Sequence, residues 1–179
     1  MPRYNKPPSL PDIPEAHSYG DAWRISCWML RGFIHGSTRG PFGSRVVSSV
    51  LTVLHLVLFI PTTVIVWGMI LRRSARYYMS PERNAVLAIV AKRGAWHIAD
   101  HVAAELGHDQ GKALRERLIG PLTIAADRAG VEIRTVAANQ KLAKQYVAEV
   151  QGLVDVGPGM PRGRKLQRPP AQDARTNLQ

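Results

Sequence analysis

Residues 46–71 form an uncharged run that constrains the fold of this chain more than any other feature. The run, VVSSVLTVLHLVLFIPTTVIVWGMIL, contains no Asp, Glu, Lys or Arg, and it is bounded by Arg45 on one side and by Arg72 and Arg73 on the other. As a helix rising ~1.5 Å per residue it would extend roughly 39 Å, whereas the hydrocarbon core of a bilayer is roughly 30 Å thick. We therefore predict a single-pass transmembrane helix over residues 46–71.

Two residues inside the run bear on how that helix would behave. Pro61 lacks a backbone N–H and is expected to kink the helix near its middle. His55 is the one ionisable residue in the run. A histidine at this depth is either a proton or ligand site or a neutral imidazole bonded within a helix pair, and the sequence leaves both interpretations open.

The charge distribution predicts how the chain sits at a membrane. The chain has 24 Lys and Arg against 13 Asp and Glu, a formal net charge of +11. Arg72, Arg73 and Arg76 form a cluster suited to anionic lipid headgroups. By the positive-inside rule this cluster favours a membrane location with the C-terminal domain in the cytoplasm. Cys27 is the only cysteine, which fits a reducing compartment for the soluble part.

The segments outside the apolar run differ in composition. Residues 1–21 are proline-rich and are predicted to be disordered. Residues 22–45 contain two tryptophans among arginines, which is typical of a helix lying on a membrane surface, followed by a linker. Residues 72–84 read as a basic juxtamembrane linker. Residues 158–179 read as a basic disordered tail, whose charge allows only weak binding of nucleic acid or lipid.

Residues 85–157 have the pattern of a small α/β domain. Short β-branched or alternating runs predict strands, and longer runs with an apolar stripe predict helices. The predicted strands are 85–91, 95–103, 131–137 and 153–156, and the predicted helices are 114–130 and 139–151. This order predicts a small mixed sheet with two helices.

A glycine-containing loop, LGHDQG at residues 106–111, precedes the first of these helices, and Asn139 is followed seven residues later by Tyr146. From Ala95 to about Gly157 these elements resemble the cofactor-binding half of the GNAT-type N-acetyltransferase superfamily. The first strands and helices of that family, which build the acceptor side, are not recognisable here. The resemblance therefore implies a GNAT-like fold that is truncated and preceded by a membrane anchor.

The resemblance implies acetyl-CoA as cofactor and assigns roles to particular residues. The loop and the helix start would surround the pyrophosphate, because backbone N–H groups at a helix N-terminus attract anions; these residues are Gly107, Gln110, Gly111, Lys112 and Ala113. Asn139 and Tyr146 would lie nearer the thioester, with Tyr146 protonating the leaving thiolate. The base that deprotonates the amine would be either His97 together with His101, or Asp100 alone.

The loop departs from the family pattern at two positions. Leu106 stands where the family has Arg or Gln, and Asp109 stands at the first loop glycine. A carboxylate at Asp109 would repel a pyrophosphate, although Lys112 and Arg115 could offset it. Metal binding is not expected, because His97 and His101 supply two ligands at most.

Three functions remain open at this point. The first is a membrane-anchored binding or adaptor module with an acetyltransferase-like domain and weak or no catalysis, completed by a protein partner or a second copy. The second is an active acetyl-CoA-dependent N-acetyltransferase. The third is a membrane-tethered helix-turn-helix over residues 98–118, which would direct Lys112, Arg115 and Arg117 toward DNA.

Overall fold

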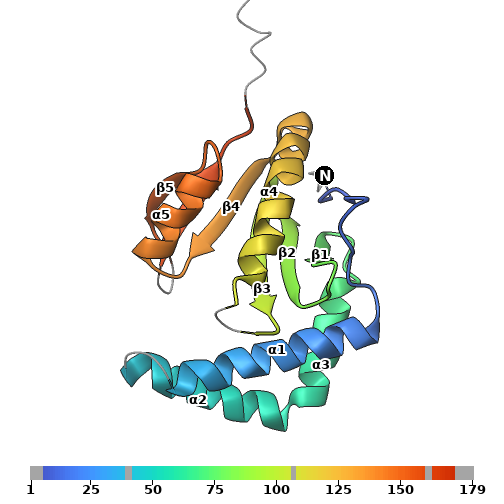
Figure 1. Ribbon diagram of the computed structural model, residues 1–179, viewed down its shortest axis with the longest axis vertical. Coiled ribbons are helices and arrows are strands. Elements are labelled where there is room, and N and C mark those ends of the chain that lie inside the picture. Colours follow the sequence, from blue (N-terminus) through green and yellow to red (C-terminus); the bar gives the residue numbers. More distant parts are fainter. Residues whose placement is uncertain (1–5, 39–41, 106–107, 160–162, 172–179) are drawn as a thin grey trace, which may run out of the picture.

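The computed structural model describes residues 6–38, 42–105, 108–159 and 163–171, with the side chains of Ser44 and Asp100 also outside this description. These residues form helices on both faces of a mixed sheet (Figure 1). In chain order the elements are α1 (Tyr19–Thr38), α2 (Phe42–Val57), α3 (Phe59–Ile70), β1 (Ala75–Met79), β2 (Ala85–Lys92), β3 (Ala95–Ala103), α4 (Gln110–Ala129), β4 (Glu132–Ala137), α5 (Gln140–Glu149), β5 (Val154–Pro158) and β6 (Arg164–Arg168).

The sheet has the strand order β1-β2-β3-β4-β6-β5. The β3–β4 pair is parallel and the other neighbours are antiparallel. Alternation along β2 separates the two faces of the sheet: Leu87 and Ile89 pack toward α4, while Val86 and Ala88 pack toward α1 and α3. A nearly continuous apolar strand such as β2 is therefore buried on both sides.

The uncharged run does not form one helix. α2 ends at Val57 and α3 begins at Phe59, with a bend of 92° between them, so the prediction of a continuous helix over residues 46–71 is wrong. The break at Leu58 lies three residues before Pro61. Pro61 has no N–H to donate to the Val57 carbonyl, and its ring would clash with that carbonyl in a continuous helix. Among the described residues, no one helix combines the length and apolarity needed to cross a bilayer; the bent pair meets that test only when its halves are taken together.

The N-terminal segment is ordered from residue 6 onward, so the prediction of disorder over 1–21 is wrong there; residues 1–5 lie outside the described residues. The segment lies along β1. Ala16 N–H donates to the Tyr77 carbonyl (2.8 Å), and the Pro14 carbonyl accepts from Met79 N–H (2.7 Å). A proline-rich segment can occupy this edge because its carbonyls still accept hydrogen bonds although its prolines donate none.

The predicted surface helix, linker and tail also take part in the fold. α1 packs Ala22, Ile25 and Trp28 against one face of the sheet. The predicted linker 72–84 contains β1, and the predicted tail contains β6, which lies between β4 and β5. The sequence did not predict β6, because RKLQR contains a single apolar residue, Leu166, which is buried. Arg168 is also buried, and its guanidinium donates two hydrogen bonds to Asp127 (2.7 and 2.8 Å).

Most elements predicted between residues 85 and 157 are confirmed. The strands at 85–91, 95–103 and 131–137 correspond to β2, β3 and β4, and the two helices correspond to α4 and α5. Because residues 98–103 belong to β3, they cannot form the first helix of a helix-turn-helix. That interpretation is wrong.

Candidate functional site

β3 and β4 separate after a short stretch of parallel pairing. Only Ala95–His97 pair with Glu132–Arg134, although β3 runs on to Ala103 and β4 to Ala137. Beyond His97 the edge of β3 that faces β4 therefore has no partner strand among the described residues. Two diverging strands leave a wedge-shaped opening in the middle of the sheet, with backbone donors and acceptors along its side.

An irregularity in β3 sets which side chains face the two sides of this wedge. Leu87 lies opposite His101 but Ile89 lies opposite Ile98, so β3 contains one extra residue at Ala99–Asp100. The extra residue shifts the alternation of side chains by one position. His101 consequently shares the α4 face with Ile98, while His97 lies on the opposite face. The expectation that His97 and His101 act together is wrong, and the side chain of Asp100 lies outside the described part.

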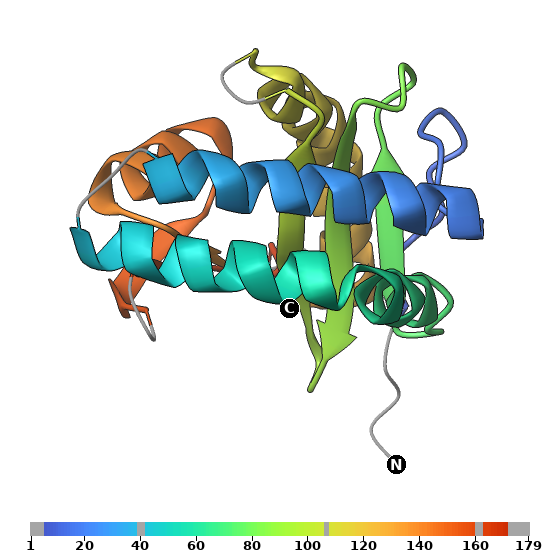
Figure 2. The ribbon, with the colours of Figure 1, turned by 90° about the horizontal axis from the view of Figure 1, so that it is seen from below.

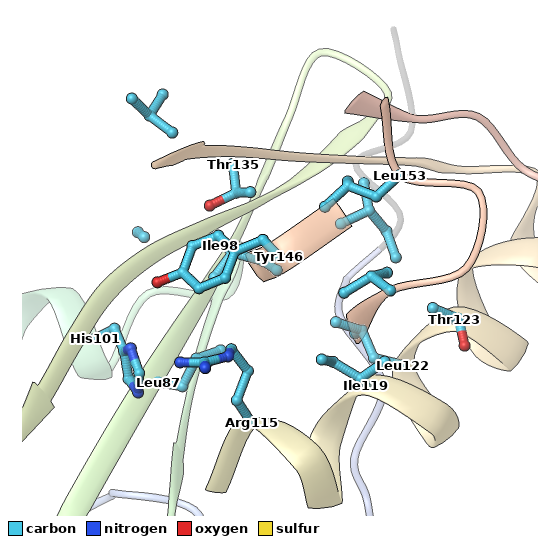
Figure 3. A pocket seen from close by; sticks show the side chains of 14 residues that line it. Leu87, Ile98, His101, Arg115, Ile119, Leu122, Thr123, Thr135, Tyr146 and Leu153 are labelled. Carbon is cyan, nitrogen blue, oxygen red and sulfur yellow. The ribbon is translucent and has the colours of Figure 1, made fainter. Parts of the chain in front are cut away.

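Cavities lie on both faces of the wedge. The cavity on the α4–α5 side has a volume of about 100 Å³, is mostly apolar, and carries His101, Arg115 and Tyr146 among its polar groups (Figure 3). The hollow on the other side has a volume of about 690 Å³ and is lined by polar residues that include His97, Arg134, Lys165 and Gln167. Both cavities are lined by Ile98, Ala99, Thr135 and Val136, which shows that the wedge is open on both faces of the sheet.

A buried ion pair holds the two helices beside the smaller cavity. Arg115 of α4 donates to both carboxylate oxygens of Glu149 in α5 (2.9 and 3.3 Å). The guanidinium also lies 4.8 Å from the ring centroid of Tyr146, and Figure 3 shows the two side chains next to each other. Arg115 and Glu149 are 34 residues apart, and nothing in their local sequence indicates that they meet. This pair was not predicted.

His101 packs against the first turn of α4. Its Nε2 lies 2.9 Å from the Gly111 carbonyl, so the neutral ring donates its N–H there. A Cβ on Gly111 would lie 2.5 Å from the same nitrogen, so a larger residue at this position would displace the His101 ring. The space beside Gly111 is thus occupied by a side chain of the protein itself. Loss of hydration and the nearby Arg115 guanidinium lower the pKa of His101 below its ordinary value.

His97 has a different environment on the other face of the sheet. It is half-buried, and this loss of hydration, together with the positive charges of Arg134 and Lys92, lowers its pKa. The imidazole of His97 is therefore neutral near pH 7 and can accept a proton. It is also the strand histidine that lines the wider hollow.

The start of α4 matches the predicted anion site in part. Asp109 has φ 52°, in the left-handed region that a glycine adopts without strain, and its side chain does not cap the helix. The N–H groups of Gln110, Gly111 and Lys112 belong to the first turn and have no partner within the helix. The N–H of Ala113 donates to the Asp109 carbonyl (2.9 Å) and is not free for a ligand. Gly107 lies outside the described residues.

Asn139 and Lys112 have structural partners. Asn139 is the N-cap of α5, and its side-chain oxygen accepts from Leu142 N–H (2.9 Å). Lys112 lies 3.9 Å from Glu116 on the exposed side of α4. Of the two residues expected near a thioester, only Tyr146 lines the cavity.

We expect the stability of the protein to fall as the pH is lowered below the ordinary histidine pKa of 6.5. Both His97 and His101 have lowered pKa values, so the unfolded chain binds more protons than the folded one in this range. The free energy of unfolding should therefore decrease as the pH falls through 6.5. Urea titrations at several pH values measure this slope.

The matched variants for that experiment are His101→Gln and His108→Gln. Glutamine at position 101 can still donate to the Gly111 carbonyl but does not titrate, so the slope should become smaller. His108 is an exposed histidine outside the wedge and gives the matched replacement. An identical slope in His101→Gln and the wild type would contradict the assignment.

Solved acetyltransferases share this fold. The chain is similar to an acetyltransferase from Thermus thermophilus, with a TM-score of 0.53 and 15% identity, over 88% of this chain and 96% of that one. It is also similar to the PaiA N-acetyltransferase from Thermoplasma acidophilum in complex with coenzyme A, with a TM-score of 0.56 and 8% identity, over 88% and 99% of the two chains. No protein-family model and no curated protein sequence matches the chain.

These similarities show the GNAT acetyltransferase fold. They also correct the predicted extent of that fold, because 88% of this chain is far more than residues 85–157. The matched part must include N-terminal segments that the sequence assigned to a membrane anchor and its flanks. The prediction of a truncated fold is therefore wrong.

Proposed function

We propose that this chain binds acetyl-CoA in the wedge between β3 and β4 and transfers the acetyl group to an amine. The observation that carries the proposal is the early separation of these two strands, with cavities on both faces. An extended ligand that contains amides can hydrogen-bond to the unpaired edge of β3 as an added strand would. The arm of coenzyme A is such a ligand, and Ile98 and Val136 would cover its apolar parts.

The fit to the remainder of the cofactor is less complete. The first-turn N–H groups of α4, which have no partner within the helix, favour a phosphate group. The carboxylate of Asp109 stands beside them and opposes it, and the space next to Gly111 is filled by His101. The described residues therefore support binding of the arm more strongly than binding of the pyrophosphate.

The chemistry follows from the two faces of the wedge. Bound acetyl-CoA would supply an acetyl thioester, whose acetyl carbon forms a bond to the amine nitrogen as its bond to sulfur breaks. His97, neutral and facing the wider hollow, would accept the proton that the amine loses. Tyr146, on the opposite face, would donate a proton to the leaving sulfur. His101 lies on the same face as Tyr146, and its Nε2–H is donated to the Gly111 carbonyl, so only Nδ1 of this ring can accept a proton.

A binding module with weak or no catalysis is the second candidate. It is favoured by Asp109, whose charge lies at the helix end where phosphate would bind. In that case coenzyme A would bind weakly, and its acetyl group would not be transferred. The same protein sample distinguishes the two functions, because binding and turnover are measured separately.

The test is the variant Val136→Trp, compared with Val154→Trp. Both valines are about half exposed on strands, but only Val136 lines the wedge. We expect Val136→Trp to weaken coenzyme A binding by at least about tenfold, because the indole fills the opening, and Val154→Trp to leave it unchanged. Isothermal titration calorimetry of the full chain measures the affinity.

Three results of this experiment have defined meanings. The transferase is supported if the wild type binds coenzyme A and acetylates a mixture of amines, and if Val136→Trp loses the binding. Binding without transfer supports the module. Equal affinity of wild type and a folded Val136→Trp variant, or no binding to the folded wild type, overturns the wedge as the cofactor site.

A further inference from the structure

The α1–α2 contact buries polar groups and leaves apolar groups outside. Among the described side chains of α2, the least exposed are Ser48, Thr52 and His55, which lie on one stripe. His55 is buried, and its Nε2 lies 3.1 Å from the carbonyl oxygen of Ser26 in α1. Ser48 packs so closely that a Cβ on Gly36 would lie 2.6 Å from its Oγ. Small and hydrogen-bonding residues between helices are typical of helices that pack within lipid.

The opposite side of α2, continuing onto α3, is apolar and exposed. We call this surface the outward face. Its members include six side chains that are each more than half accessible: Val50, Val53, Leu56, Val57, Ile60 and Ile65. Folded proteins in water seldom expose so continuous an apolar surface unless another apolar phase covers it.

We propose that the outward face of α2 and α3 inserts into the surface of an anionic lipid bilayer. The proposal is independent of acetyl-CoA binding. It replaces a membrane-crossing anchor by a shallow one. α2 and α3 have 16 and 12 residues, so at ~1.5 Å per residue they reach roughly 24 and 18 Å, and neither is long enough for the roughly 30 Å hydrocarbon core.

The arrangement of the helices suits a position in the interface. Figure 2 shows α1 and α2 side by side, with α3 seen nearly along its axis because it is bent by 92° from α2. Two aromatic pairs lie where these helices meet: Trp23 contacts Phe59, with ring centroids 4.7 Å apart, and Tyr19 contacts Trp67, with centroids 5.9 Å apart. Both indoles remain partly exposed. Tryptophan and tyrosine favour the boundary between headgroups and acyl chains.

Charge identifies the bilayer as anionic and argues against a second copy of the chain. No Asp or Glu occurs between residues 22 and 81, whereas Arg24, Arg45, Arg72 and Arg73 lie in this part of the chain and are exposed. Two copies joined through the outward face would bring like charges together. An anionic lipid surface would instead attract these arginines as the apolar side chains insert.

The test is flotation of the full chain with vesicles made of equal parts of phosphatidylglycerol and phosphatidylcholine, or of phosphatidylcholine alone. We expect strong binding to the anionic vesicles and weaker binding to the neutral ones. Val53→Asp should reduce binding to the anionic vesicles by at least about tenfold, because it places a carboxylate where an apolar side chain inserts. Val154→Asp, at a similarly exposed valine on β5, should not change binding.

A second variant protects the test against misfolding. Arg72→Gln with Arg73→Gln changes only exposed side chains and should abolish most of the preference for phosphatidylglycerol. Circular dichroism confirms the fold of each variant. Equal flotation of the wild type and Val53→Asp, or no flotation of the wild type, overturns the proposal. Self-association of the wild type that Val53→Asp abolishes, without vesicle binding, would instead make the outward face a contact between copies.

Discussion

Replacing Arg115 by methionine is expected to lower the free energy of unfolding by about 2–4 kcal/mol. The side chains of Arg115 and Glu149 are only 11% and 18% exposed, so the variant leaves a largely buried carboxylate without its partner. It also removes the guanidinium from the face of Tyr146. Denaturant unfolding of both proteins at pH 7 measures the difference.

The control for this loss is Arg134→Met. Arg134 is also paired with a glutamate, Glu132, but its side chain is 41% exposed, and pairs of this kind contribute about 1 kcal/mol or less. The double variant Arg115→Met with Glu149→Leu should recover much of the lost stability, because an apolar pair can replace a buried ion pair. A loss for Arg115→Met no larger than that for Arg134→Met would show that the pair does not hold α4 to α5.

The stabilisation by the Arg115–Glu149 pair is expected to decrease at acidic pH. Burial alone would raise the pKa of Glu149, but the hydrogen bonds from Arg115 and Gln145 outweigh it and lower this pKa below 4.5. The stabilisation is therefore complete above that pH and is lost as the pH falls through the lower folded value. The difference in stability between wild type and Arg115→Met should shrink in this acidic range.

Replacing Gly163 by alanine is expected to lower the free energy of unfolding by about 3 kcal/mol or more. Gly163 has φ 92°, which disfavours an L side chain, and an added Cβ would overlap the backbone carbonyl oxygen of Ala137. The overlap lies where β6 begins to pair with β4, and backbone cannot move aside as a side-chain end can. For a chain of this size we expect a fall in Tm of roughly 6–12 °C.

Gly94→Ala separates the effect of the positive φ from the effect of the overlap with backbone. Gly94 also has a positive φ, 76°, in the turn between β2 and β3, but nothing lies within 4 Å of an added Cβ. This variant should lose only about 1 kcal/mol, from the backbone conformation alone. Equal losses at Gly94 and Gly163 would mean that β6 does not approach β4 as closely as described.

The α/β order between residues 85 and 157 could be predicted because strands and helices there have local signatures. β2 is an unbroken apolar run, β4 alternates, and Asn139 caps α5 as its position in the sequence indicated. Each of these features depends on neighbours within one element, which a sequence displays directly.

The missed parts of the site depend on contacts between distant residues. Arg115 in α4 is paired with Glu149 in α5. The polar strand β6 is held in the fold by the hydrogen bond between Arg168 and Asp127, which lie 41 residues apart. The positions of His97 and His101 on opposite faces follow from one extra residue in β3, opposite Ala88. A period-two pattern in the sequence cannot show that extra residue, because it is defined by the neighbouring strand.

The sequence by itself determined that residues 46–71 are apolar, that the surrounding charge is basic, and that an acetyltransferase-like order of elements follows. Only the tertiary structure decided what the apolar run does. It breaks before Pro61, turns Ser48 and His55 toward α1, and directs Val53 and Val57 outward. Hydropathy records how apolar a segment is, whereas the direction of each side chain depends on the helix against which the segment packs.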